Sequence, residues 1–401
     1  MGYSWVFSFI GKVVDEPRAV SAGQQYAAVT RPAALVFRKK ILKWSETFIA
    51  AQSGAMTRYS PLAVGLSRDS SGAAYLGQIP QLLLDEYSAF PALAKFLFKS
   101  LGRPPRRWFK AIAGYQPTVL HAHFGLSTKP ASSLARALGI PLVVTYHGSD
   151  ITVRSRTAAE AGQRRRDFAA ADRVIAVSNF IADALRAAGC PDHKITVHYV
   201  GVDTARFVPG ASPRSATEVL FVGRLHQVKG VIHLLRAMAE VRMAIPAAEL
   251  AIAGDGPLRD ELAHEAARLG IPARFLGVQM PDQVRELMQH AAVLAGPSIV
   301  DLRGRAEGMG IAFLEAQASG LPVVASTSGG IGEGIVHGET GFLFKPGDEA
   351  ALAGHLRTLL ADADLRARMG LAARAHIERN FDLARQTAKL EDIYDEVRAR
   401  C

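Results

Sequence analysis

Short apolar runs alternate with stretches of helical periodicity along nearly the whole chain, beginning near residue 31. Each run is followed by turn-forming residues, such as the His-Gly-Ser-Asp turn at 147–150, and therefore predicts a buried strand. Strands that alternate with helices are typical of parallel sheets covered on both faces, so we predict an α/β fold. The expected strands are Ala34–Phe37, Leu62–Leu66, Val119–His121, Leu142–Tyr146, Arg173–Val177, Thr196–Val200, Val219–Val222, Leu250–Ala253, Arg274–Leu276, Val293–Ala295, Pro322–Ala325 and Phe342–Phe344.

The periodicity lapses between Val202 and Glu218, where proline, glycine and serine interrupt the alternation. Because 401 residues are too many for one ordinary core, this segment predicts a linker between two doubly wound domains, at 31–207 and 208–380. Doubly wound sheets bind ligands at the carboxyl ends of their strands, so the two domains are expected to face a central cleft.

Both ends of the chain lie outside these two domains. Residues 1–30 carry little pattern and form an N-terminal extension without an assigned role. Within residues 381–401, apolar positions recur at helical spacing from Leu383 to Val397 and predict an amphipathic helix. The pattern does not indicate which domain this helix packs on.

The composition is that of a folded globular protein, with 49% hydrophobic and 21% charged residues. Two cysteines are too few for a disulfide framework or a cysteine-based metal site, which fits a reducing compartment. No apolar stretch is long enough to span a membrane, and the run Trp5–Ile10 lacks the preceding cations of a secretion signal. We therefore expect a cytoplasmic protein.

The net charge of +10 indicates an anionic partner, either nucleic acid, lipid or a phosphorylated substrate. Aromatic RNA-binding strands and zinc-finger spacings are absent from the sequence, so nucleic acid is not expected. Residues 91–113 interleave cations with large apolar side chains, which suits an anionic membrane surface. A surface helix pair with core aromatics and solvated charges explains the same pattern. The residues concerned are Lys95, Lys99, Arg103, Arg106, Arg107 and Lys110, with Phe96, Leu97, Phe98, Leu101, Trp108 and Phe109.

The densest cluster of candidate chemistry lies between Glu307 and Ser326. Glu307 and Glu315 flank a glycine-broken turn and the start of a helix predicted from Ile311 to Ala318. Unpaired N–H groups at a helix start favour a phosphate, and carboxylates accept hydrogen bonds from sugar hydroxyls. The segment therefore predicts a site for a sugar nucleotide.

Several further motifs occur in a fixed order along the chain. They are Trp44-Ser-Glu-Thr-Phe-Ile49, His121-Ala-His-Phe-Gly125, Thr145-Tyr-His-Gly-Ser-Asp150, Phe221-Val-Gly-Arg-Leu225 with Lys229-Gly230, Gly254-Asp-Gly-Pro257 and the two-glutamate block. With these motifs the chain resembles the family 4 retaining glycosyltransferases (group 1), and in particular the enzymes of exopolysaccharide and colanic acid synthesis. The resemblance runs from about Ala34 to the C-terminus and implies the GT-B fold, in which two Rossmann-like domains face a cleft. It also implies that residues 31–207 bind the acceptor and residues 208–380 bind the sugar nucleotide.

The resemblance implies four catalytic residues, which are His147, Arg224, Lys229 and Glu307. Arg224 and Lys229 follow a predicted strand, where two cations can neutralise a diphosphate; an ordinary basic surface loop is the alternative. Glu307 would contact the transferred sugar and Glu315 the ribose, whereas a helix cap and a solvated helix residue are the alternatives. The remaining donor contacts implied are the backbone of Gly308, Met309, Gly310 and Ile311, with Val278 beside the base.

The acceptor side is less well defined. His147 resembles the family's active-site histidine, whereas His121 and His123 fit either packing or acceptor binding. Ser45 and Glu46 are further acceptor-side candidates. The cationic segment Val36–Lys43 stands where the family often has a glycine-rich turn, so the acceptor site is expected to differ from the usual one.

The implied reaction moves a hexose from a UDP- or GDP-sugar to a glycan or lipid-linked acceptor with retention of configuration. No metal and no cofactor are expected, because Asp362 and Asp364 fit a solvated helix start better than a metal site. Two alternatives remain, a sugar-nucleotide epimerase of similar fold and a non-catalytic carbohydrate-binding protein on a degenerate transferase fold. The first lacks a motif for its acid–base chemistry, and the second predicts loss of Arg224, Lys229 or Glu307, which are all present.

Overall fold

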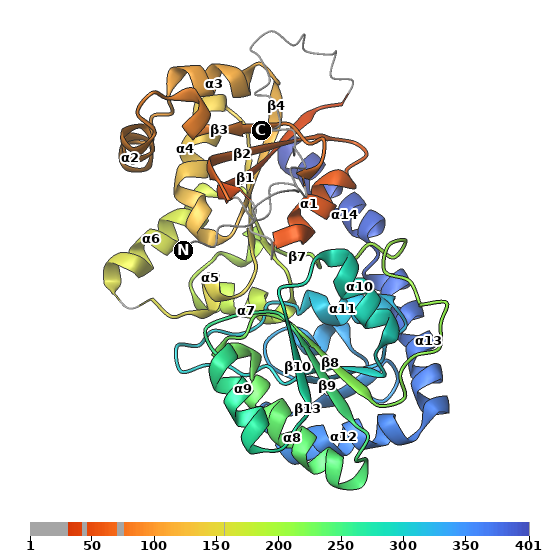
Figure 1. The fold of residues 1–401 in the computed structure, drawn as a ribbon. Helices are drawn as coiled ribbons and strands as arrows, with labels where there is room; N and C mark the ends of the chain where they lie inside the picture. Colours follow the sequence, from red (N-terminus) through yellow and green to blue (C-terminus); the bar gives the residue numbers. More distant parts are fainter. Residues whose placement is uncertain (1–30, 42–45, 70–75, 156, 401) are drawn as a thin grey trace, which may run out of the picture.

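The structure is a computed structural model that describes residues 31–41, 46–69, 76–155 and 157–400. Within these residues the strands form two sheets, one of seven strands and one of six, in which neighbouring strands are parallel. Figure 1 shows the first sheet in the upper half of the molecule and the second in the lower half. The predicted α/β class with two doubly wound sheets is confirmed.

Both sheets have the same order of strands. The first runs β3-β2-β1-β4-β5-β6-β7 and the second β10-β9-β8-β11-β12-β13, so the order reverses between β1 and β4 and between β8 and β11. Such reversal points leave a crevice at the carboxyl ends of the strands, where ligands bind. The strands of the first sheet are β1 Ala33–Ile41, β2 Ser60–Arg68, β3 Gln81–Leu83, β4 Pro117–His123, β5 Leu142–Tyr146, β6 Arg173–Ala176 and β7 Ile195–Val197. Those of the second are β8 Glu218–Val222, β9 Glu249–Ala253, β10 Ala273–Gly277, β11 Val293–Gly296, β12 Val323–Ser326 and β13 Gly341–Phe344.

Helices cover both faces of each sheet (Figure 1). Those of the first half are α1 Thr47–Gly54, α2 Pro91–Leu101, α3 Arg106–Ala113, α4 Thr128–Leu138, α5 Ser149–Thr152, α6 Ala158–Ala170 and α7 Asn179–Ala187. Those that follow are α8 Val231–Ala244, α9 Arg259–Arg268, α10 Pro281–His290, α11 Ile311–Ala318, α12 Glu349–Ala361, α13 Ala363–Asn380 and α14 Leu383–Arg398. Among the described residues, no helix combines the length and the apolar composition that crossing a bilayer requires.

Alternate residues of β1 show why a continuously apolar strand lies at the centre of a two-sided sheet. Leu35 and Phe37 pack in one core cluster, whereas Ala34 and Val36 pack in the cluster on the opposite face. Successive side chains of a strand point to opposite faces, so both faces of β1 are covered. Burying each large side chain of this kind stabilises the fold by about 2 kcal/mol.

Each of the predicted strands corresponds to a strand of the structure, and β3 is the strand that the sequence pattern missed. This strand has three residues and pairs only with β2 at the edge of the sheet. An edge strand this short has too few positions to show a period. The expected domain boundary between residues 207 and 208 lies in the segment between β7 and β8 and stays a prediction.

The C-terminal helix α14 packs on the first sheet, although α13 before it packs on the second half of the chain (Figure 1). Val202 in the linker donates its N–H to the carbonyl of Phe381 and accepts from the N–H of Leu383, so the outgoing and returning segments run side by side. The apolar side chains of α14 then join those of β1, β4 and β5. The chain therefore passes twice between the two halves.

Glu391 attaches α14 to the first half. This fully buried carboxylate accepts hydrogen bonds from three consecutive backbone N–H groups, those of Thr57 (2.9 Å), Arg58 (2.7 Å) and Tyr59 (3.1 Å), just before β2. A buried carboxylate is tolerated only when its oxygens are bonded in this way. The next residue, Asp392, is exposed and pairs with the Arg58 side chain at 2.6 Å.

We predict that Glu391→Ala destabilises the protein by about 3 kcal/mol, because three backbone N–H donors lose their buried acceptor. Asp392→Ala provides the control, since an exposed ion pair contributes about 0.5 kcal/mol. Chemical denaturation of both variants measures the difference. Equal losses in the two variants would show that Glu391 is not the anchor.

Candidate functional site

The loops after β8 and β11 meet at the reversal point of the second sheet. Gly230 has φ +63°, and a Cβ there would lie 2.0 Å from the carbonyl oxygen of Pro297, so only glycine permits this approach. The N–H of Ile299 donates to the carbonyl of Val228 at 2.8 Å. These contacts place Lys229, from the first loop, beside the residues that lead into α11.

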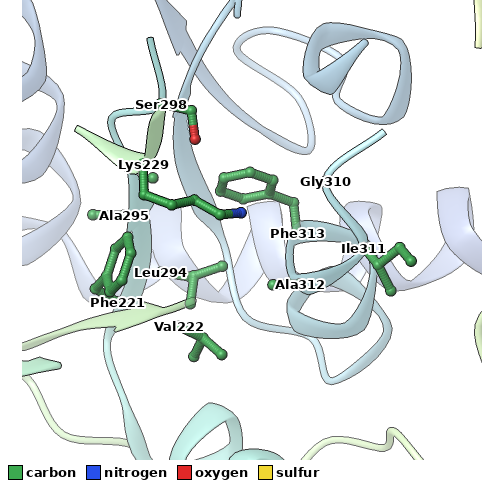
Figure 2. Close-up of a pocket in the computed structure, with 11 residues that line it drawn as sticks. Phe221, Val222, Lys229, Leu294, Ala295, Ser298, Gly310, Ile311, Ala312 and Phe313 are labelled. Atoms are coloured by element: carbon green, nitrogen blue, oxygen red, sulfur yellow. The ribbon is translucent and has the colours of Figure 1, made fainter. Parts of the chain in front are cut away.

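Lys229 forms an ion pair with Glu307, with 3.0 Å between Nζ and Oε1, and both side chains are largely buried. Figure 2 shows the lysine reaching past Phe313 towards the start of α11, over a cavity of about 30 Å³. The cavity is lined in part by Gly310, Ile311 and Ala312. A volume of this size holds about one water, so it forms the floor of a ligand site and not the whole of it.

The first turn of α11 offers backbone donors at the same place. Gly310 precedes the helix with φ +73°, a conformation that glycine adopts without strain. Among the described residues, no acceptor receives a hydrogen bond from the N–H of Ile311 or Ala312. Unpaired N–H groups and the helix dipole favour an anion at this end.

The turn before α11 touches the first half of the chain. A Cβ on Gly308 would lie 1.9 Å from the carbonyl oxygen of His147, so the two backbones are in direct contact. Ser178, the N-cap of α7, donates its hydroxyl to the carbonyl of Gly308 at 2.7 Å. The structure therefore brings His147 to the turn that carries Glu307.

Asp150 holds the backbone around His147. Its carboxylate accepts from the N–H groups of Gly125 (3.0 Å), His147 (3.1 Å) and Gly148 (2.9 Å). Burial raises the pKa of Asp150, whereas these three hydrogen bonds lower it. The His-Gly-Ser-Asp turn is thus fixed by its own last residue.

The His147 ring lies among other rings. Its Nε2 is 3.1 Å from Nδ1 of His123, and the rings of Phe48 and Phe124 lie at centroid distances of 5.1 and 4.4 Å. Burial, with further contributions from His121 and Arg38, lowers the pKa of His147 well below its usual value. His147 is therefore a neutral imidazole at physiological pH, and His123 orients it.

His121 is a packing residue in this structure. It is buried, with Nδ1 2.7 Å from the Tyr394 hydroxyl and Nε2 2.6 Å from the Thr145 hydroxyl. Burial, followed by the charge of His198, lowers the pKa of His121 to about 3. Because both ring nitrogens are already bonded, the geometry favours packing over acceptor binding for this histidine.

The acceptor-side cations are partly neutralised. Arg38 on β1 forms a two-point ion pair with buried Glu46, with Nε 3.0 Å from Oε2. Its guanidinium carbon also lies 3.9 Å from the ring centroid of Phe124. Glu46 thus holds Arg38 beside the histidines, in the cationic segment that stands where the family often has a glycine-rich turn. Ser45 lies outside the described residues.

The structure places the other predicted donor residues on α11, on the loop after β8 and directly after β10. Glu315 lies one turn into α11, and burial raises its pKa to about 7, an effect that the charge of Arg206 opposes. Arg224 is exposed on the loop after β8 and, within the described residues, makes no ion pair. Val278 is exposed directly after β10.

Glu333 provides a second contact between the halves that the sequence did not reveal. Its carboxylate accepts from the backbone N–H groups of Asn179 (2.8 Å) and Phe180 (2.9 Å) at the start of α7, and from the Tyr199 hydroxyl (3.1 Å). Glu333 ends the sequence Gly329-Gly-Ile-Gly-Glu333. The sequence shows this glutamate, whereas its hydrogen-bond partners at the start of α7 depend on how the two halves face each other.

Within the described residues, no group of three or more His, Cys, Asp or Glu side chains is arranged to hold a metal ion. Asp362 is the N-cap of α13 and accepts from the N–H of Leu365 at 2.8 Å. Asp364 lies in the first turn of the same helix. The predicted helix start at this motif is confirmed.

Known proteins resemble this chain in both sequence and fold. Residues 204–376 match the family Glycosyl transferases group 1, and residues 67–206 match Glycosyltransferase Family 4. The glycogen synthase of Mycobacterium tuberculosis (strain CDC 1551 / Oshkosh) is 32% identical over 280 residues, which are 67% of this chain and 66% of that protein. The chain therefore spans just under two thirds of that relative's length.

A second relative, from Escherichia coli (strain K12), carries the provisional name colanic acid biosynthesis glycosyltransferase WcaL. It is 30% identical over 67% of this chain and 68% of its own length. The Anabaena protein HepE, solved in complex with UDP and glucose, superposes with a TM-score of 0.72 at 20% identity, over 91% of this chain and 100% of that one. The chain belongs to glycosyltransferase family 4, the group 1 glycosyltransferases of GT-B fold, a family of retaining hexosyltransferases.

Proposed function

We propose that this protein is a retaining glycosyltransferase that moves a hexose from a UDP- or GDP-sugar to a glycan or a lipid-linked oligosaccharide. The observation that carries the proposal is the meeting of Lys229, Glu307 and the open start of α11 at the reversal point of the second sheet, opposite His147. A cation, a carboxylate and free amides at one place suit a diphosphate joined to a sugar. The relative WcaL suggests a role in a bacterial surface or exopolysaccharide, and HepE suggests a uridine nucleotide.

In the proposed reaction, the bond between the anomeric carbon and the diphosphate oxygen breaks on the same face at which the acceptor hydroxyl attacks. The hydroxyl proton passes to the departing phosphate oxygen, so the enzyme supplies no nucleophile. Negative charge grows on the diphosphate, where Lys229, Arg224 and the first amides of α11 stabilise it. Glu307 leaves its ion pair with Lys229 to accept hydrogen bonds from the sugar.

We assign His147 a contact with the donor sugar and its diphosphate. A neutral imidazole can donate from one nitrogen while the other is bonded, and His123 holds Nε2 of His147. Glu315 would accept the ribose hydroxyls, and Val278 would lie beside the base. On the acceptor side we place His123 and Glu46, the latter through Arg38. The setting proposed is the cytoplasm, at the inner face of the membrane.

Donor binding can be measured without knowing the acceptor. We predict that UDP or GDP raises the melting temperature of the protein. At a nucleotide concentration of about one hundred times the Kd, the free energy of unfolding should rise by about 2.7 kcal/mol. Lys229→Ala should weaken this binding by about 2 kcal/mol, or roughly thirtyfold, through loss of a charge-assisted contact. Lys389→Ala is the control, since Lys389 is exposed on α14. Equal shifts in wild type and Lys229→Ala would refute the phosphate site.

Product analysis separates the alternatives. Transfer releases the nucleoside diphosphate, whereas an epimerase returns an intact nucleotide with an altered sugar. A non-catalytic binding protein would be stabilised by the ligand and leave it unchanged.

The affinity for UDP should rise with pH through the pKa of Glu315. Hydroxyl donors favour the ionised carboxylate, and with a pKa of about 7 the ionised fraction grows about tenfold between pH 6 and pH 8. The terminal phosphate of UDP titrates in the same range, near pH 6. In the Glu315→Gln variant the phosphate of UDP still titrates, whereas the side chain at 315 does not. The difference between the two proteins therefore reports on the Glu315 carboxylate. Calorimetry of both proteins should show a steeper pH dependence in the wild type; parallel profiles would argue against the ribose contact.

We also predict that chelation of divalent ions leaves the rate of nucleotide release unchanged. Lys229, Arg224 and the amides of α11 can neutralise the diphosphate between them. The measurement compares initial rates with EDTA and with added Mg²⁺, using Asp362→Asn as a second variant. A decrease in the initial rate of more than about tenfold with EDTA, reversed by Mg²⁺, would contradict the prediction. It would correspond to about 1.4 kcal/mol in the activation free energy.

A further inference from the structure

The outer side of α2 carries a continuous row of exposed apolar side chains. Phe90, Leu93, Phe96 and Leu101 are 73%, 55%, 63% and 64% exposed, and Leu97 is 39% exposed. Positions three and four apart share one side of a helix, so these residues form a single surface, the α2 face. Figure 1 shows α2 at the outer edge of the first half, away from the second sheet. Contiguous exposed apolar side chains of this kind mark an interaction site.

The fold does not use these side chains for its own core. Phe98 of α2 and Trp108 of α3 are buried and pack edge to face at 5.5 Å, and the indole N–H of Trp108 donates to the carbonyl of Leu82. The aromatic residues of this region therefore divide into two sets. One set supports the core, and the α2 face remains in solvent.

The segment that carries the α2 face is strongly positive. Residues 91–113 contain six cations and no acidic residue. Lys95 pairs with Asp85 at 2.9 Å. The other five make no ion pair with any described residue, and they are Lys99, Arg103, Arg106, Arg107 and Lys110. An apolar surface with a rim of free cations complements a bilayer that exposes anionic headgroups above its acyl chains.

The cations continue from α2 towards the cleft. Burial lowers the pKa of Lys39 on β1, and the nearby charges of Lys99, Arg38 and Lys129 lower it further while Asp167 opposes them. Lys39 therefore lies near Lys99 at the end of α2, and its neighbour in β1 is Arg38, whose guanidinium packs over Phe124 beside His147. A membrane on the α2 face would lie next to the acceptor side of the site.

We propose that the α2 face docks on an anionic phospholipid bilayer. The exposed leucine and phenylalanine side chains would enter the boundary between headgroups and acyl chains, and the free cations would contact lipid phosphates. Docking in this way would present a lipid-linked acceptor to the cleft along Lys99, Lys39 and Arg38. This last step rests on the proposed transferase function, whereas docking itself does not.

Flotation of the full chain with vesicles, without nucleotide, tests the proposal. The protein should float with phosphatidylcholine vesicles that contain about 30% phosphatidylglycerol, and at least about tenfold less with phosphatidylcholine alone. The double variants Leu93→Ser/Phe96→Ser and Arg106→Glu/Arg107→Glu should each lose at least about tenfold in bound protein. The control Met243→Ser/Leu371→Ser changes side chains that are 79% and 75% exposed on α8 and α13, and should bind as the wild type does. All these positions are exposed, so the melting temperatures should remain unchanged.

Three results would overturn the docking proposal. The first is failure of the wild type to float with anionic vesicles. The second is flotation of the α2 variants to the same extent as the wild type, which would locate binding elsewhere in the chain. The third is a dimer in light scattering that becomes a monomer in Leu93→Ser/Phe96→Ser, which would make the α2 face a protein interface. Stabilisation by UDP, measured on the same variants, reports on the donor site separately.

Discussion

The close backbone contact between the turn at Gly308 and the carbonyl of His147 is the constraint on which the site depends. No side chain fits between these segments, since a Cβ on Gly308 would lie 1.9 Å from that oxygen. Gly330 is equally restricted, because a Cβ there would lie 2.1 Å from the carbonyl of Gly308. Glycine at 308 lets the two halves approach until His147 lies beside the turn that carries Glu307, and glycine at 330 lets the neighbouring loop pack on this turn. A larger residue at 308 would hold the halves apart and separate the two parts of the site.

The short helix α11 connects this contact to the rest of the second half. Its first turn faces the cavity beneath Lys229, and its last turn is bound by two half-buried arginines. Arg374 donates to the carbonyls of Ala318 (2.5 Å), Phe207 (2.6 Å) and Thr204 (3.0 Å), and Arg214 donates to that of Ser319. Cations at the C-terminal end of a helix satisfy its free carbonyls and offset its partial negative charge. Arg374 also joins α11 to the linker, so one network holds both the proposed donor site and the connection between the halves.

The proposed acceptor side is organised differently from the proposed donor side. His121, His123 and His147 are neutral because burial lowers each pKa, and Arg38 is held by Glu46. The donor side instead keeps Arg224 exposed and the first amides of α11 free. Charge that develops during transfer would therefore gather on the second half, while the first half offers rings, neutral hydrogen-bonding groups and, at its outer edge, the α2 face.

The sequence by itself determined the strands other than β3, their parallel arrangement and the motifs of the site, because these depend on local periodicity and on short-range turn chemistry. The resemblance to the family also placed Lys229, Glu307 and the start of α11 in one predicted site. Only the tertiary structure decided that α14 returns to the first sheet, that Glu333 caps α7 and that His121 is bonded to Tyr394 from a helix 273 positions later. It likewise separated the buried aromatics of 91–113 from the exposed ones. Contacts between segments far apart in the chain depend on how packed faces fit together, and no local pattern encodes that fit.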